Sequence, residues 1–237
     1  MKLGTLLLFL FSFQFIYAQT DAPIAQDSSM AMSAIKVAEY RKFSFDLSVG
    51  HSAALVYMES QKFGINHYKA AVRYMFTESF GLSGGYIYSD YTTSTGQLTS
   101  KMNSIKFDLV YNIGRSLRLL KTEGSTFTVL SHLGLGYGWH KSPQLESRKA
   151  ENFLPISIGL TPTFMSSNGL SLFMDFELVN NFQQDVRFDG VFVAPDVKWE
   201  GEANGILLNI SVGASLSFGG PVRHADFYHR KPIVPNF

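Results

Sequence analysis

The chain has 237 residues, a net charge of +1, a pI near 7.9 and no cysteine. The balanced charge gives no reason to expect nucleic acid as a partner, and the lack of cysteine excludes disulfides and thiolate metal sites. The mean hydropathy of +0.05 is ordinary for a soluble protein, but it also fits a membrane barrel, in which only alternate residues meet lipid.

Residues 1–18 have the organisation of a secretory signal peptide. Lys2 supplies the early charge, an apolar run extends from Leu6 to Phe15, and Ala18 is the small residue at the expected break. The apolar run is too short to cross a membrane as a helix. No cysteine follows the break, so we expect export without a lipoprotein anchor.

Eight later segments alternate apolar and polar residues, which is the pattern of β-strands with one apolar face. In 205–218, for example, Ile206, Leu208 and Ile210 share one face and Asn209 lies on the other. The segments are 43–50, 66–77, 80–91, 103–113, 126–140, 152–164, 170–181 and 205–218. Strands can cross hydrocarbon only as a closed barrel, because every backbone polar group needs a partner there. The sequence therefore predicts an all-β fold, an eight-stranded antiparallel up-and-down transmembrane barrel over residues 43–218.

The connections between these segments alternate in length. Residues 77–79 and 166–169 are tight turns, whereas 51–65, 92–102, 141–151 and 182–204 are longer. Bacterial barrels place short turns in the periplasm and long loops outside. We therefore expect the outer membrane of a Gram-negative bacterium, with two periplasmic segments, 19–42 and 219–237. The connection at 114–125 is longer than this pattern predicts.

Aromatic residues gather at the strand ends on the lipid-facing side, as in the two girdles of membrane barrels. One predicted girdle consists of Phe43, Phe76, Phe80, Phe127, Phe164 and Phe218. The other lies near the opposite rim and consists of Tyr68, Tyr86, Tyr88, Tyr137 and Trp139. A soluble sandwich has no reason to place its rings at strand ends.

The inward-facing positions carry a nearly balanced set of charges. They are Asp46, Lys69, Arg73, Lys106, Asp108, His132, Asp175 and Glu177. Unpaired buried charge is costly, so near balance predicts a mutually satisfied network that packs the lumen. The alternative is a gated ion or proton path through the same groups. Asp46 and Arg73 are expected to face each other on neighbouring strands, although barrel shear can shift that register.

On these features the chain resembles the small outer-membrane barrels of the outer-membrane protein A type. The resemblance covers residues 43–218, and Asn168 to Glu177 is similar to the turn and seventh strand of that family. The last strand ends in Phe218, similar to the terminal aromatic signal of such barrels. The segment from Arg223 to Phe227 resembles the stretch that leads into a peptidoglycan-binding domain. The chain stops at Phe237, so we expect that domain to be missing.

Catalytic and metal-binding patterns are weak. His51 with Ser52 and His140 with Ser142 are the candidate nucleophile–base pairs of a lipid-modifying enzyme, and both lie in or near loops. His132 and His140 are too far apart along one strand to share a metal. We therefore predict no enzyme activity and no cofactor.

The leading hypothesis is a non-enzymatic structural or adaptor subunit of an outer-membrane complex, in contact with membrane lipid and a protein partner. Porin-like transport of small solutes or ions is the alternative, and a lipid-modifying enzyme is a weaker one. An Asp189-Gly190 turn suggests a hairpin that extends the last two strands. Candidate partner contacts in this loop and in the C-terminal tail are Phe188, Phe192, Trp199, Phe227 and Tyr228. We expect the tail to be separate from the barrel and to order on binding a partner.

Overall fold

The structure is a computed structural model, and it describes residues 40–55, 61–96, 99–119, 125–142, 150–167, 169–184, 186–188, 205–219 and 223–228. The expected signal peptide, the segment 19–39 and the expected contacts Phe192 and Trp199 lie outside these ranges. Within the described residues, no helix is long and apolar enough to cross a membrane.

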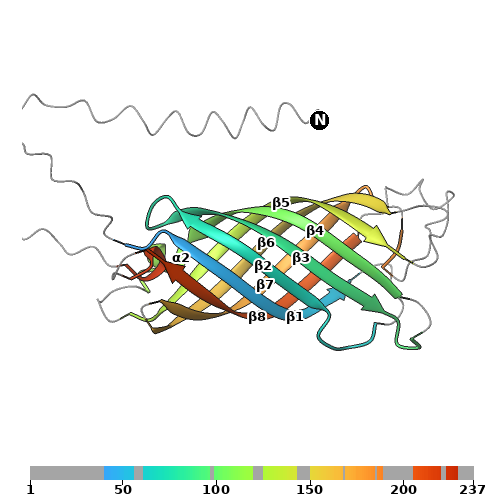
Figure 1. The fold of residues 1–237 in the computed structure, drawn as a ribbon, viewed down its shortest axis with the longest axis horizontal. Coiled ribbons are helices and arrows are strands. Elements are labelled where there is room, and N and C mark those ends of the chain that lie inside the picture. Colours follow the sequence, from blue (N-terminus) through green and yellow to red (C-terminus); the bar gives the residue numbers. More distant parts are fainter. Residues whose placement is uncertain are drawn as a thin grey trace, which may run out of the picture. The chain divides into compact units, whose positions relative to one another are not determined.

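Eight antiparallel strands form a closed barrel in which each strand pairs with the next and β8 pairs with β1 (Figure 1). The strands are β1 (Phe43–Ala54), β2 (His67–Met75), β3 (Phe80–Thr92), β4 (Thr99–Asn112), β5 (Phe127–Lys141), β6 (Glu151–Ser167), β7 (Leu170–Phe182) and β8 (Gly205–Phe218). The predicted fold class and all eight predicted strands are confirmed, with ends that differ by at most four residues.

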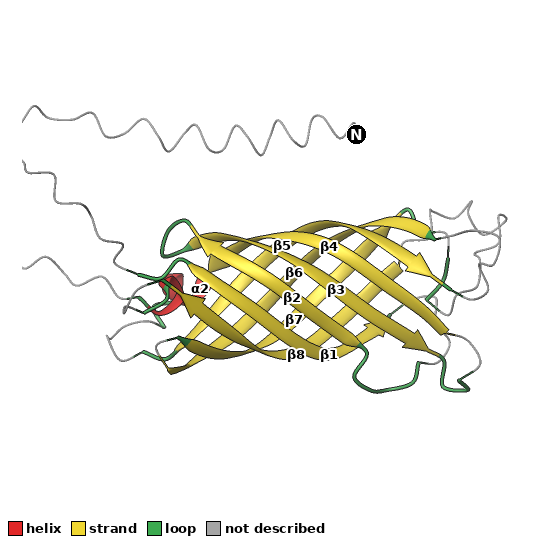
Figure 2. Cartoon of the chain, viewed as in Figure 1, coloured by secondary structure: helices red, strands yellow, loops and turns green. Residues whose placement is uncertain are grey.

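The barrel has two distinct ends. The turn end carries the short connections 76–79 and 168–169, together with the start of β1 and the finish of β8. The loop end carries the longer connections, as Figure 2 shows. The irregular connection after β4 begins with a short helix, α2 (Ile113–Ser116), which the Asn112 side chain caps by accepting a hydrogen bond from the Arg115 N–H at 3.1 Å.

The burial pattern is the reverse of that in a soluble protein. Large apolar side chains on every strand are exposed, among them Leu109, Ile158 and Val212, whereas Lys106, His132 and other polar side chains on the opposite parity are buried. An exposed apolar belt around a polar interior is the arrangement that hydrocarbon solvent selects. The barrel is therefore built to span a bilayer.

Neighbouring residues of β8 test this assignment of faces. Val212 is 53% exposed and Ser211 is 3% exposed. Replacing Val212 with Arg is expected to cost about 2–4 kcal/mol if it lies near the bilayer midplane. The same change at Ser211 should cost less, because Asp175 lies opposite it across β7 and β8. A refolding titration in lipid vesicles measures both values, and equal costs would contradict the assignment.

Candidate functional site: the charged lumen

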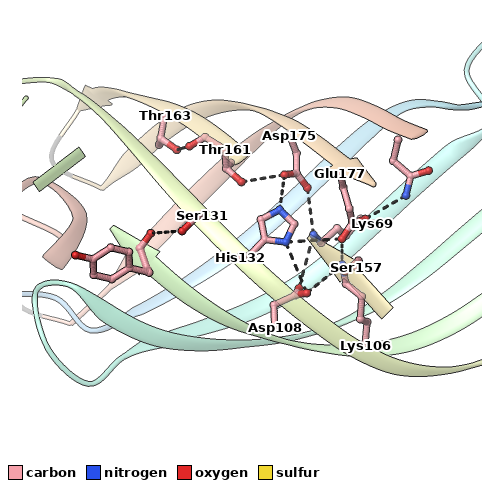
Figure 3. Close-up of polar contacts among 12 residues, drawn as sticks. Lys69, Lys106, Asp108, Ser131, His132, Ser157, Thr161, Thr163, Asp175 and Glu177 are labelled. Carbon is pink, nitrogen blue, oxygen red and sulfur yellow. Dashed lines mark hydrogen bonds and ion pairs between the residues drawn. The ribbon is translucent and has the colours of Figure 1, made fainter. Parts of the chain in front are cut away.

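The centre of the lumen holds a cluster of charged side chains from opposite walls (Figure 3). Lys106 on β4 contacts Glu177 on β7, and its Nζ atom lies 3.0 Å from Asp108 Oδ1 and 3.0 Å from Ser157 Oγ. Lys69 Nζ on β2 lies 3.3 Å from Asp175 Oδ2. These contacts tie together strands that are not neighbours in the sheet.

His132 on β5 lies among three carboxylates. Its Nε2 atom is 2.9 Å from Asp175 Oδ1, and its Nδ1 atom is 3.7 Å from both Asp108 Oδ1 and Glu177 Oε1. Thr161 donates a further hydrogen bond of 2.9 Å to Asp175 Oδ1. The imidazole therefore bridges acidic groups of β4 and β7.

Glycines give these long side chains their room. Gly134 lies opposite Asp108, and a Cβ atom there would collide with the Asp108 carboxylate and the Ser157 hydroxyl. A Cβ atom at Gly159 would collide with the His132 ring, which lies across the β5–β6 pair. The two glycines therefore provide the space that the Asp108 and His132 side chains occupy.

A second cluster lies at the turn end of the lumen and centres on Arg73. Its Nε atom is 3.3 Å from Asp46 Oδ2, so the predicted facing of these two residues is confirmed. Its Nη1 atom is 2.9 Å from Asp226 Oδ2, and His224 Nδ1 is 3.1 Å from the same oxygen. Burial alone would raise the pKa of Asp226, but the Arg73 charge and then His224 outweigh it and hold that pKa well below its usual value.

Asp226 belongs to a short segment after β8 that closes the turn end. This segment, 223–228, contains the 3₁₀ turn η3 (Ala225–Phe227), whose three residues are all buried. Asn112 Nδ2 donates to the Asp226 carbonyl at 3.0 Å, and Arg115 Nη2 donates to the carbonyls of Ala225 at 3.2 Å and Tyr228 at 2.7 Å. The basic connection after β4 thus clamps the C-terminal segment in place.

The expectation of a tail separate from the barrel is wrong for residues 223–228, and Phe227 is not an available partner contact. Phe227 is 2% exposed, and Tyr228 packs against Tyr40 with ring centroids 5.4 Å apart. The physical reason is the buried Arg73 guanidinium, which has five N–H donors: Asp46 lies against its Nε atom and Asp226 against its Nη1 atom. Asp226 and His224 were missed because the sequence after Phe218 lacks the alternation that marks a strand.

The loop end is closed by an apolar cluster. Its buried members are Tyr91, Met102, Phe153, Val179, Phe188 and Leu207. Phe188 is fully buried against Tyr91, with ring centroids 5.2 Å apart, and Ser100 donates a hydrogen bond of 2.5 Å to its carbonyl. The predicted exposure of Phe188 is therefore wrong, because this ring covers the mouth of the barrel instead of facing solvent.

Between these closures, two small cavities remain in the described lumen. The larger, about 50 Å³, is lined by Asp46, Lys69, Arg73 and Asp175, among others. The smaller, about 30 Å³, lies beyond the Lys106–Glu177 pair and is lined by Tyr91 and Asn209, among others. Such volumes hold a few water molecules, and they do not form an open channel.

The lumen cluster offers ligand atoms for a metal ion, but the ammonium group of a lysine already occupies the place that a cation would take. Asp108, His132 and Glu177 present one ligand atom each, all within 4.8 Å of one another. Lys106 contacts both carboxylates of this group. A divalent cation would have to displace its ammonium group, so the cluster is satisfied by the chain's own cation.

The described serine–histidine contacts do not form an accessible catalytic pair. Ser52 Oγ bonds to Tyr91 Oη at 2.7 Å, while the neighbouring His51 ring contacts the Gly64 carbonyl at 2.8 Å. A pair that the sequence reading missed, His67 with Ser89 at 3.0 Å, is buried in the loop-end half of the lumen.

The predicted girdle residues lie at the two ends of the barrel, and most of their rings are exposed. At the turn end, Phe43 pairs with Phe218 across β1 and β8. The rings of Phe127 and Phe164 pack in a tilted arrangement with their centroids 4.6 Å apart. The remaining rings at this end are Phe76 and Phe80. At the loop end the aromatic residues are Tyr68, Tyr86, Tyr88, Tyr137 and Trp139.

No known protein-family model matches the chain, and no curated protein matches its sequence. Solved structures with similar folds include Neisserial surface protein A, at 13% identity and a TM-score of 0.46, covering 74% of this chain and 97% of that chain. A major outer membrane protein from Thermus thermophilus has 15% identity and a TM-score of 0.48, and the match covers 75% of this chain and 98% of that chain. The attachment invasion locus protein of Yersinia pestis has 15% identity and a TM-score of 0.38, and the match covers 75% of this chain and 97% of that chain. The predicted resemblance to small eight-stranded outer-membrane barrels is confirmed as a matter of fold.

Proposed function

We propose that this protein is a non-enzymatic, non-conducting barrel of the Gram-negative outer membrane that acts as a structural or adaptor component of a membrane complex. The observation that carries the proposal is the closed lumen. Phe188 and its cluster cover the loop end, residues 223–228 cover the turn end, and the charges between them are paired within the barrel. By the usual polarity of bacterial barrels, the turn end and both termini face the periplasm.

The adaptor surface that we propose lies on the connection after α2. Leu117 is 64% exposed and Leu119 is 39% exposed. Arg118 between them has a φ of 57°, a conformation that is uncommon for a non-glycine residue and is often found where function requires it. The Leu117 N–H donates to the Ile113 carbonyl and the Leu119 N–H donates to the Gly114 carbonyl, each at 2.8 Å. Exposed apolar side chains on this hydrogen-bonded turn favour a protein contact at this end.

A pull-down from native outer membranes tests the adaptor role. The double variant Leu117→Ser/Leu119→Ser is expected to lose a partner that the wild-type barrel retains, while the matched change Leu55→Ser at the loop end retains it. Leu55 is 54% exposed, so its replacement is a surface change of the same kind. An unchanged set of co-purifying proteins in the double variant would remove the support for this surface.

Transport of small solutes or ions is the second candidate, because a charged cavity of about 50 Å³ is lined by Arg73, the residue that Asp226 of the C-terminal segment contacts. Planar-bilayer recording on the refolded barrel separates the two functions. We expect no steady conductance from the full-length chain, because paired charges and packed rings fill the lumen. Sustained ion conductance by the intact protein would favour transport.

A further inference from the structure

Two adjoining hollows lie on the outer surface, one over β8 and β1–β3 and one over residues 62–66 and β3, and Tyr68 and Tyr88 line both. The first, about 440 Å³, is a groove on the apolar wall. Leu47, Ala70 and Tyr86 are cross-strand neighbours in its lining, so the short Ala70 side chain forms a floor between two larger ones. This groove faces the bilayer, where its natural occupant is an acyl chain.

The second hollow, about 430 Å³, lies at the loop end and is chemically mixed. Phe63 contributes an aromatic ring that is 85% exposed. Lys62, Asp90 and Thr92 line it as well, and the Asp90 carboxylate accepts a hydrogen bond of 3.4 Å from the Tyr88 hydroxyl. This combination provides an apolar ring face beside groups that accept or donate hydrogen bonds.

Hydrogen bonds tie the segment 61–66, which contains Phe63, to β1 and β3. Asn66 accepts from the Ser52 N–H at 2.7 Å and donates to the Ser52 carbonyl at 3.0 Å. Gln61 donates to the same carbonyl at 2.6 Å, and the Lys62 N–H donates to the Thr92 carbonyl at 2.9 Å. Because these bonds are already formed, the segment 61–66 that exposes Phe63 loses less conformational freedom when a ligand binds.

We propose that the joined hollows bind one glycolipid molecule from the leaflet around the loop end, with an acyl chain in the groove and a phosphorylated sugar headgroup in the rim hollow. The sugar ring would stack on Phe63, Asp90 would accept from its hydroxyls, and Lys62 would attract its phosphate. The headgroup hollow meets the acyl groove at Tyr68, so one amphipathic molecule spans both. The inference requires a barrel in a bilayer, but it does not require the adaptor role.

Native mass spectrometry of the detergent-refolded, full-length barrel tests the proposal by lipid titration. The probes are a monophosphorylated, acylated glucosamine disaccharide, a phosphatidylglycerol of equal acyl length, and the soluble sugar phosphate without acyl chains. We expect the glycolipid to bind about tenfold more tightly than phosphatidylglycerol, the equivalent of one good hydrogen bond to a charged group. The soluble sugar phosphate should bind more weakly than either lipid.

Two variants separate the hollows. Phe63→Ala should weaken glycolipid binding and leave phosphatidylglycerol binding unchanged, whereas Ala70→Phe should weaken both by filling the groove. The controls are Leu133→Ala and Leu133→Phe on β5, a lipid-facing position that is 54% exposed and lies outside the groove. Equal affinity of the wild type for the two lipids, or unchanged glycolipid binding in both groove and rim variants, would overturn the proposal. The readout involves no other protein, so it is independent of the adaptor test.

Discussion

Replacing Lys106 with methionine is expected to destabilise the barrel by about 3–5 kcal/mol, the cost of breaking a buried ion pair by removing one partner. Lys106 and Glu177 are each 1% exposed, and Asp108 lies 3.0 Å from the same ammonium group. The methionine would leave the Asp108 and Glu177 carboxylates without the ammonium group that contacts both of them. Urea unfolding in lipid vesicles measures the loss.

A double-mutant cycle assigns this loss to the pair. Glu177→Gln removes one carboxylate while keeping its shape and its contact with Asn209, which donates to Glu177 Oε2 at 3.1 Å. If the two groups interact directly, the cost of Lys106→Met should be smaller in the Glu177→Gln background, and the two losses should not add. Additive losses would contradict a direct interaction while leaving the barrel fold unaffected.

The parts of the structure that the sequence predicts are those governed by a short period. Alternation along each strand separates Val212 from Ser211, and the same parity puts Lys106 and Asp108 inside. Successive side chains of a strand point to its two opposite faces. An alternation of apolar and polar residues over nine or more positions therefore assigns each side chain to lipid or lumen. This is why the fold class, the approximate strand bounds and the inward charges follow from the sequence alone.

The parts that sequence reading missed depend on contacts between distant segments. Phe188 lies beside the predicted Asp189-Gly190 turn, and only the mouth of the finished barrel explains its burial against Tyr91. Asp226 lies 153 positions beyond Arg73 (226 minus 73), in a segment with no alternation. The available signal was the number of donors on Arg73, because a buried guanidinium has five N–H groups and one carboxylate cannot accept from all of them.

The C-terminal segment is therefore expected to stabilise the barrel rather than to hang from it. Removing residues 221–237 deletes the Asp226 partner of Arg73 and the buried Phe227 ring. We expect a loss of about 3 kcal/mol or more, in line with the opening of a buried charge pair. Removing only residues 229–237 is the matched control, since it keeps every contact described for residues 223–228.

The single change Asp226→Asn tests the charge itself through its pH dependence. The pKa of this carboxyl is depressed in the folded barrel, so its charge stabilises the protein above the unfolded-state pKa of about 3.9, and this contribution is lost as the pH falls below that value. The wild type should therefore exceed the variant in stability at pH 7, and the difference should shrink in acid. Arg73 and His224 contact the Asp226 carboxylate, and Asp46 contacts Arg73. All three residues are unchanged in the variant. Unfolding curves for both proteins between pH 7 and pH 3 measure the difference, and a gap that stays constant with pH would show that Asp226 acts through packing alone.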